Sequence, residues 1–296
     1  MAALAALAAN AADPTPEQRA VAYLAVEVPR WPAENGCFSC HNNGDSARAL
    51  YTASRLGYAV PKLALEGTTR WLSRPAEWDS NRGNPGFSDK KLARIQFAAA
   101  LAEAPDSGGP PLLEAAESLI PYQAPDGSWI VDGGALGSPA TYGTALATYL
   151  ARRTLQKAGA GRFGDAIAKS DQWFLTLAPA SLLEAGAALL ALPRSEAVQK
   201  RSLAYILPAQ SADGGWGPYR SSPSEPFDTA VAVLALRAIG EPERTRQPIA
   251  RGRAFLIGRQ QPGGGWPETT RPPGAQSYAQ HISTSGWATL ALLLTR

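Results

Sequence analysis

Sulfur-containing and imidazole side chains are scarce in this sequence. Its 296 residues include two cysteines, two histidines and a single methionine, Met1. The chain also lacks a long apolar run, so the sequence predicts no segment that spans a membrane. The net charge of +3 is small and no basic run is interleaved with aromatic residues, which argues against nucleic acid as a partner. Hydrophobic residues make up 45% of the chain, enough to bury a large core.

Both cysteines fall in one short motif. Residues Cys37, Cys40 and His41 spell C-x-x-C-H, the attachment signature of a c-type haem. The two thiols can each form a thioether with a haem vinyl group, and the histidine can then bind the iron as an axial ligand. We therefore predict one covalent haem c at Cys37 and Cys40, with His41 on the iron. A structural zinc site, a disulfide and two buried free thiols are the alternatives.

The rest of the chain alternates helical patterns with Gly/Pro-rich breaks, and these patterns form six pairs. The first members carry many charges and are expected over 16–31, 61–74, 110–122, 162–177, 194–208 and 246–261. The second members are rich in Ala and Leu, as for helices buried on both sides, and are expected over 44–57, 88–104, 139–157, 179–192, 227–239 and 279–295. Six charged outer helices and six apolar inner helices predict an all-α fold, an α6/α6 double-layer toroid.

Closure of such a ring would bring the two histidines to one rim. Long connections precede most inner helices, and long loops often carry sites. His281 starts the last expected inner helix, which must lie beside the first one, just after His41. Since no methionine is available there, we predict His281 as the second axial ligand of a bis-His haem; an open, five-coordinate iron is the alternative.

Other residues on this rim could surround the haem. The aromatic candidates for its walls are Tyr51, Trp78, Tyr142, Trp216, Phe227, Trp266 and Tyr278. The candidates for pairing with its propionates are Arg48, Arg82, Arg220 and Arg271.

A Gln…Gly-Gly-Trp pattern recurs in the second half of the chain. It reads Gln260 with Gly264-Gly265-Trp266, Gln210 with Gly214-Gly215-Trp216, and, in a worn copy, Gln123 with Gly127-Ser128-Trp129. This resembles the QW repeat of the terpene-cyclase and prenyltransferase α/α toroids, well over 110–295 and weakly over 14–104. We expect the glutamine to cap free backbone groups at a helix end, with the tryptophan stacked on it.

The resemblance implies two rival activities. Squalene–hopene cyclases protonate their substrate with the central acid of a D-x-D-D-T-A motif, but the matching residues 225–230 read Glu-Pro-Phe-Asp-Thr-Ala, and only Asp228 remains. An Asp at a helix start is more often an N-cap, which lowers its pKa. Protein prenyltransferases hold zinc with Asp, Cys and His, but here Cys40 and His41 are adjacent and awkward partners on one tetrahedral ion. We therefore expect neither activity.

These observations predict a c-type monohaem protein for electron transfer or haem binding, and not an enzyme. The alternatives are a toroid binding module for a lipid, isoprenoid or glycan with zinc or a disulfide at the cysteines, and a haem enzyme with an open iron site. The expected partner is a redox protein or a larger electron-transfer assembly.

The alanine-rich residues 1–12 contain Ala9-Asn10-Ala11, typical of the end of a signal peptide, but no basic n-region. We interpret 1–12 as a signal-peptide remnant or disordered tail and 13–296 as one toroid domain carrying the motif at 37–41. The family of c-type haem proteins implies a periplasmic or other extracytoplasmic location.

Overall fold

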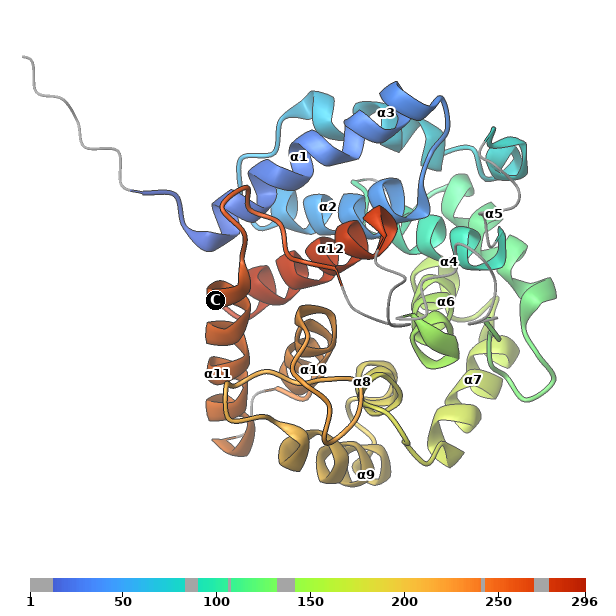
Figure 1. Ribbon diagram of the computed structural model, residues 1–296. Coiled ribbons are helices and arrows are strands. Elements are labelled where there is room, and N and C mark those ends of the chain that lie inside the picture. The colour runs from blue at the N-terminus through green and yellow to red at the C-terminus, as the bar shows by residue number, and fades with distance from the viewer. Residues whose placement is uncertain (1–12, 83–89, 106–107, 132–141, 241–242, 269–276) are drawn as a thin grey trace, which may run out of the picture.

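The computed structural model describes residues 13–82, 90–105, 108–131, 142–240, 243–268 and 277–296. Within these ranges the chain is helical, and its helices form two concentric layers (Figure 1). The outer layer contains α1 (Pro16–Asn35), α3 (Lys62–Leu72), α5 (Pro110–Leu119), α7 (Gly164–Thr176), α9 (Glu196–Ile206) and α11 (Glu243–Arg259). The inner layer contains α2 (Ala47–Arg55), α4 (Lys90–Leu101), α6 (Gly143–Gly159), α8 (Leu182–Ala191), α10 (Pro226–Ala238) and α12 (Tyr278–Leu294). The fold is an α/α toroid, as the alternating patterns predicted.

Composition explains which helix goes inside. In α10 the run from Pro226 to Leu236 is buried on every side, and α12 is buried from Ile282 to Leu293. Small apolar residues all round a helix allow it to pack against two inner neighbours and an outer helix at once. The outer helices expose one face to solvent and bury the other.

The first inner helix begins earlier than the sequence predicted. A π-helical stretch, Cys40–Ser46, runs directly into α2, and its residues from His41 to Ser46 are all buried. We expected the helix to begin at residue 44, after a connection over residues 32–43. The polar side chains are satisfied by neighbouring elements. Asn43 donates to Val28 O and Thr68 Oγ1, at 3.1 and 2.8 Å, and so ties this stretch to α1 and α3.

The three Gln…Trp turns share one pattern of hydrogen bonds. Each glutamine donates to a glycine carbonyl of its own turn and to a carbonyl in the first half of an outer helix further along the ring. Gln260 bonds Gly264 O at 3.0 Å and Pro16 O at 2.9 Å. In the other two turns the bond to an outer helix runs from Gln210 to Pro248 O, at 2.9 Å, and from Gln123 to Ala166 O, at 2.8 Å. The glutamines therefore cap carbonyl oxygens of other outer helices, a form of capping that the sequence did not predict.

The tryptophans of these turns are fully buried and hold the turn from inside. The indole N–H of Trp266 donates to Leu256 O at 2.7 Å, in the last turn of α11. Trp216 and Trp129 make the equivalent bonds to Ile206 O and Leu119 O at 2.8 and 2.9 Å. Each turn is thus joined to the outer helix that precedes it.

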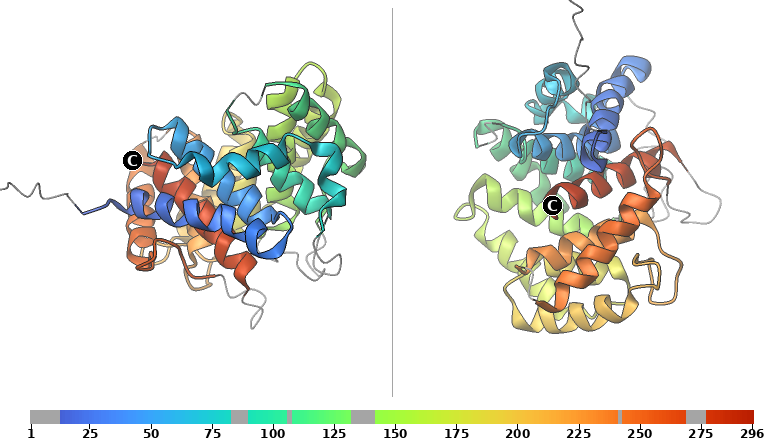
Figure 2. Two further views of the ribbon diagram at one scale, coloured as in Figure 1. Left: turned by 90° about the horizontal axis from the view of Figure 1, so that it is seen from above. Right: turned by 90° about the vertical axis from the view of Figure 1, so that its left-hand side faces the viewer.

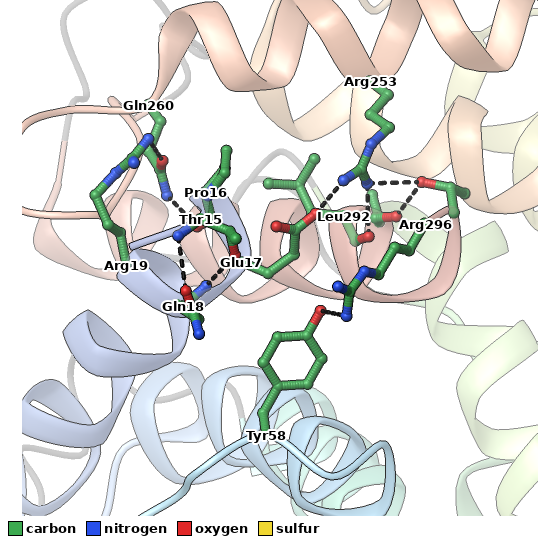
Figure 3. Close-up of polar contacts among 12 residues, drawn as sticks. Thr15, Pro16, Glu17, Gln18, Arg19, Tyr58, Arg253, Gln260, Leu292 and Arg296 are labelled. Carbon is green, nitrogen blue, oxygen red and sulfur yellow. Dashed lines mark hydrogen bonds and ion pairs between the residues drawn. The ribbon is translucent and has the colours of Figure 1, made fainter. Parts of the chain in front are cut away.

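The first and last elements close the ring. Helix α1 packs on both α3 and α12, and Figure 2 shows α1 beside α12 in its two views. Figure 3 shows the polar contacts at this junction: Glu17 of α1 pairs with Arg253 of α11, and Gln260 reaches Pro16. Arg253 also donates to Leu292 O of α12 at 2.6 Å. Residues 1–12, where we predicted a signal remnant, lie outside the described residues.

No helix in the described part of the chain is both long and apolar enough to cross a bilayer, in line with the absence of a membrane segment predicted from the sequence.

Candidate active site

A buried carboxyl group, Asp45, lies where the π-helical stretch meets α4, α6 and α12. It is only 1% exposed. Ser283 Oγ donates to Asp45 Oδ2 at 2.9 Å, and Gln96 Nε2 donates to the same oxygen at 2.7 Å. Tyr142, whose hydroxyl lies 3.2 Å from Asp45 Oδ1, donates from the start of α6. Three inner elements besides its own therefore position this one carboxyl.

His41 extends the network by one step. Its Nδ1 lies 2.8 Å from Ser283 Oγ. Because the Ser283 hydroxyl donates to Asp45, the serine oxygen accepts from a protonated Nδ1 of His41. The result is a chain of hydrogen bonds from His41 through Ser283 to Asp45.

Burial sets the protonation states of this network. Removal from water raises the pKa of the Asp45 carboxyl, and the charge of Arg48 and the three hydrogen bonds limit the rise. Burial also lowers the pKa of His41 to about 4, so the imidazole is neutral at neutral pH. The pKa of Asp45 is thus higher than that of an exposed aspartate, and the nearby His41 carries no positive charge that would lower it.

Three aromatic side chains pack beside Asp45. Tyr142, Phe227 and Trp287 are buried, with ring centroids 5.9–6.5 Å apart. The guanidinium of Arg48 covers the Trp287 ring at 4.2 Å. Arg48 is 6% exposed, and its Nε and Nη2 have no hydrogen-bond partner. A cation and an aromatic layer thus separate Asp45 from the space along the ring axis.

That space is a cavity of about 430 Å³ lined by residues of all six inner helices or their ends. Arg48 and Trp287 line it at one end, and Leu234 and Leu290 lie one turn further along. At the other end, residues such as Arg55 come from the C-terminal ends of the inner helices. Asp45 and Ser283 lie about one helical turn before Arg48 and Trp287, so they sit below the floor of the cavity. The charged end of the cavity lies where the inner helices finish, whereas the long loops that we expected to carry a site lie where these helices begin.

The structure brings the elements of the two histidines together but turns their rings apart. The π-helical stretch packs against α12, as ring closure predicted. His41 bonds Ser283, whereas His281 Nε2 lies 2.7 Å from the Tyr23 hydroxyl of outer helix α1. Residues 281 and 283 are about 200° apart around a helix, so the imidazoles lie on opposite sides of α12.

The two cysteines are partly buried, and neither is in a disulfide. Within the described ranges, no group of three or more His, Cys, Asp and Glu side chains is arranged to hold a metal ion. The haem roles of Cys37, Cys40, His41 and His281 stay a prediction from the motif.

The other residues singled out in the sequence have varied positions. Arg48 is at the cavity floor, Arg82 and Arg220 are exposed, and Arg271 lies outside the described residues. Trp216 and Trp266 fill the Gln…Trp turns, and Tyr278 donates to Glu27 Oε2 at 2.8 Å. Asp228 and Thr229 are buried in the first turn of α10, where Thr229 Oγ1 accepts from Trp216 N at 2.9 Å.

Sequence reasoning missed Asp45. The signal was the run Asn42-Asn43-Gly44-Asp45-Ser46, which is polar although it enters an inner helix of a ring whose other inner helices are rich in Ala and Leu. Polar residues at an inner position need a reason, and here the reason is a shared network of hydrogen bonds.

Comparison with known proteins shows which sequences part of this chain resembles. The family model of the squalene-hopene cyclase C-terminal domain matches residues 177–295. Drimenyl diphosphate synthase of Streptomyces showdoensis is 45% identical over 67 residues, which are 23% of this chain and 12% of that protein. Lanosterol synthase erg7A of Aspergillus fumigatus is 30% identical over 103 residues, 33% of this chain and 13% of that protein. The chain therefore matches only about an eighth of the length of these curated relatives.

Solved structures agree on the fold. The ent-copalyl diphosphate synthase from Streptomyces platensis has a TM-score of 0.54 at 21% identity, over 85% of this chain and 50% of that one. The type II terpene cyclase MstE from Scytonema has a TM-score of 0.58 at 13% identity, over 95% of this chain and 98% of that one. This chain has the same α/α toroid fold as these structures. At these identities the likeness concerns the fold alone.

These findings correct the function predicted from the C-x-x-C-H motif. The interpretation as an electron-transfer cytochrome, or as a protein without enzymatic activity, is wrong, because the relatives with sequence similarity are cyclases. The alternatives of a passive binding module and a haem enzyme fall with it. The haem at C-x-x-C-H stays a prediction, and His41 of that motif contacts the hydrogen-bond network of Asp45.

Proposed function

We propose that this protein is a cyclase of linear isoprenoids that starts ring closure by transferring a proton from Asp45 to a carbon–carbon double bond. The environment of Asp45 carries the proposal. Burial raises the pKa of this carboxyl, which favours the protonated form that an acid catalyst must have. The apolar walls of the adjoining cavity suit a hydrocarbon chain.

The residues around Asp45 suit both its protonated form before the proton transfer and its carboxylate form after it. The Asp45 O–H bond breaks as a C–H bond forms at the alkene, leaving a tertiary carbocation and a carboxylate. The bonds from Ser283, Gln96 and Tyr142 strengthen as that carboxylate forms, so they stabilise the transition state. A neighbouring double bond then attacks the cation to form a ring, and loss of a proton ends the reaction. The product is an isomer of the substrate.

The position of the acid differs from that in the resembling motif. Phe227 stands where the D-x-D-D motif has its central aspartate, and it packs on Tyr142. Asp45 accepts a hydrogen bond from the hydroxyl of the same Tyr142. Asp45 and Phe227 therefore both contact Tyr142. This supports a proton donor on the π-helical stretch before α2, where the D-x-D-D motif would place it on α10.

The proposal requires one movement. Arg48 and Trp287 cover Asp45 from the cavity side, so a double bond can reach the carboxyl only when the Arg48 side chain leaves the Trp287 ring. This contact is a cation–π pair of roughly 0.5–2 kcal/mol, small enough for substrate binding to displace.

The test is cyclisation in heavy water. The protein is incubated with farnesyl diphosphate, geranylgeranyl diphosphate and squalene, and products are analysed by gas chromatography and mass spectrometry. We expect a cyclic isomer that carries one deuterium from the solvent at the protonated carbon. Asp45→Asn keeps the shape of the side chain but has no acidic proton, so product formation should fall by at least ~10³-fold.

Asp228→Asn is the matched control, because it also replaces the carboxyl of a fully buried aspartate by an amide on an inner helix. It should keep most of the activity, with circular dichroism confirming that both variants fold. Cyclisation that survives in Asp45→Asn, or no cyclic product from any of the three substrates, would exclude the proposal.

A further inference from the structure

A cluster of positive charges lies at the open end of the axial cavity. Arg55 at the end of α2, and Arg153 and Lys157 of α6, all pair with Glu103, which follows α4. Arg55 Nη1 and Lys157 Nζ each lie 2.8 Å from a Glu103 oxygen. Three cations thus share one carboxylate, and the cluster keeps two positive charges in excess.

The excess charge faces the cavity and solvent. The Glu103 side chain is 3% exposed, whereas those of Arg55, Arg153 and Lys157 are 53%, 41% and 35% exposed. The carboxylate therefore lies behind its cations. Burial alone would raise the pKa of Glu103, but the charge of Arg153 and the bonds from Lys157 and Arg153 hold it at about 2, so the carboxylate is charged at neutral pH.

Hydrogen bonds to backbone carbonyls hold two cations near the mouth, Lys157 and Arg237. Lys157 also donates to Ala102 O at 2.8 Å, just past the end of α4. Across the mouth, Arg237 lines the same cavity and donates from Nε to Leu294 O at 3.2 Å. Carbonyls at helix C-termini carry partial negative charge and attract cations. Lys157 and Arg237 are therefore held in place before any ligand arrives, and Arg55 and Arg153 are held by Glu103.

The deeper walls are mainly apolar, with Arg48 at the floor. Leu190, Leu234, Leu290 and the covered ring of Trp287 line the cavity below the charged mouth, and Glu103 is the one acidic residue among the described residues that line it. A molecule that matches this arrangement has an anionic head and a long apolar tail.

We infer that Arg55 and Arg153, which line the mouth of the cavity, and Lys157 beside them bind the diphosphate of a prenyl diphosphate whose tail enters the cavity. This inference rests on the proposed function for the tail and deepens it, because it selects an anionic substrate over a neutral hydrocarbon such as squalene. It places the diphosphate at the end of the cavity away from Asp45, so the distal double bond of the chain points toward the acid.

Calorimetric titration tests the head group without turnover, using inorganic pyrophosphate, farnesyl diphosphate and farnesol as probes. We expect farnesyl diphosphate to bind at least ~10-fold more tightly than farnesol, because charge-assisted hydrogen bonds add to the same apolar contact. Raising the salt concentration should weaken pyrophosphate binding. Farnesoic acid, with a single carboxylate, distinguishes a diphosphate site from a general anion site by binding between the other two.

Two variants should shift pyrophosphate affinity in opposite directions. Arg153→Gln removes a cation and should weaken binding by roughly 10-fold, whereas Glu103→Gln removes the competing anion and should tighten it. Arg55→Gln replaces Arg153→Gln if the latter does not fold. Arg70→Gln, on the exposed face of α3, is the control and should bind as the unaltered protein does.

The outcomes separate this inference from the proposed function. Equal affinity for farnesol and farnesyl diphosphate, or unchanged affinity in both Arg153→Gln and Glu103→Gln, overturns the diphosphate site. Cyclisation of squalene by a protein that does not bind pyrophosphate would support the proposed cyclase function and contradict the diphosphate site. Pyrophosphate binding with the expected pattern, but without any cyclic product, would support the diphosphate site and contradict the role of Asp45 as an acid catalyst.

Discussion

Three buried polar residues, His41, Ser283 and Asp45, are joined by two hydrogen bonds across the contact between the π-helical stretch and α12. A buried polar group is expensive to leave unpaired, so a network in which each member has a partner also fixes the orientation of every member. At the scale of single residues, the chemistry depends on which of these side chains are protonated. Burial favours a protonated Asp45 and a neutral His41.

The neutral state of His41 predicts a pH dependence of stability. In the unfolded chain the imidazole titrates near its model value of 6.5, but in the folded protein only near 4. Between these values the unfolded state binds more protons, so stability falls as the pH is lowered from 6.5 toward 4, by about 3 kcal/mol in total. His41→Gln should lack this component. Urea unfolding of both proteins at pH 7, 5.5 and 4 should show their free energies of unfolding converging, and parallel profiles would contradict it.

At the scale of elements, the Gln…Trp turns require glycine at one position. Gly127, Gly214 and Gly264 have φ of +95°, +90° and +98°. A Cβ at Gly264 would lie 2.3 Å from Arg19 O of α1, and the equivalent atoms at the other two turns are also backbone carbonyls of outer helices. The turn can approach its neighbouring helix this closely only without a side chain.

Gly264→Ala should therefore destabilise the protein by about 2–4 kcal/mol, from backbone strain and the forced separation of α1. Gly258→Ala is the matched control, because Gly258 lies in α11 with open space around its Cα. It should stabilise by roughly 0.5–1 kcal/mol through higher helix propensity. Thermal unfolding of the two variants should shift in opposite directions, and a shift in the same direction would argue against strain at the turn.

Much of the architecture could be predicted from the sequence, because helix periodicity and Gly/Pro breaks are local signals. The expected ranges 110–122 and 279–295, for example, differ from α5 and α12 only at their ends. The π-helical start at Cys40 could not be predicted, since its polar residues find their partners on α1, α3, α4 and α12.

The site was harder to predict for the same reason. C-x-x-C-H is visible in five consecutive residues, whereas Asp45 becomes unusual only when Gln96, Tyr142 and Ser283 surround it. The ring predicted that residues near 41 and 281 would meet. The side of α12 that each imidazole occupies depends on packing against Tyr23 and Ser283, which no pattern shows.

For the whole molecule, the junction between α1 and the C-terminal helices decides whether the ring is closed. Glu17 is buried and pairs with Arg253, whose guanidinium also reaches Leu292 O and Thr295 Oγ1 (Figure 3). Burial alone would raise the pKa of Glu17, but its backbone hydrogen bond and Arg253 outweigh it and lower the pKa. One arginine thus connects α1, α11 and α12.

Arg253→Gln should lower the free energy of unfolding by about 2–4 kcal/mol at pH 7, because it leaves a buried carboxylate without its cation. Arg70→Gln removes an exposed ion pair with Glu66 and should change it by less than about 0.5 kcal/mol. Urea titration at equilibrium measures both, and hydrogen exchange should show faster opening of α1 in Arg253→Gln only. Equal losses in the two variants would mean that the junction contributes no more than a surface pair.

This junction has a consequence for biosynthesis. A chain made from its amino end exposes α1 and residues 40–46 to the cytosol or to chaperones long before α12 emerges from the ribosome. Ser283 and Tyr278, which bond His41 and Asn42, arrive only with that helix. The nascent protein therefore carries Asp45 and His41 without the helix that bonds them, and a product of interrupted translation that lacks α12 should be recognised by quality control as incompletely folded.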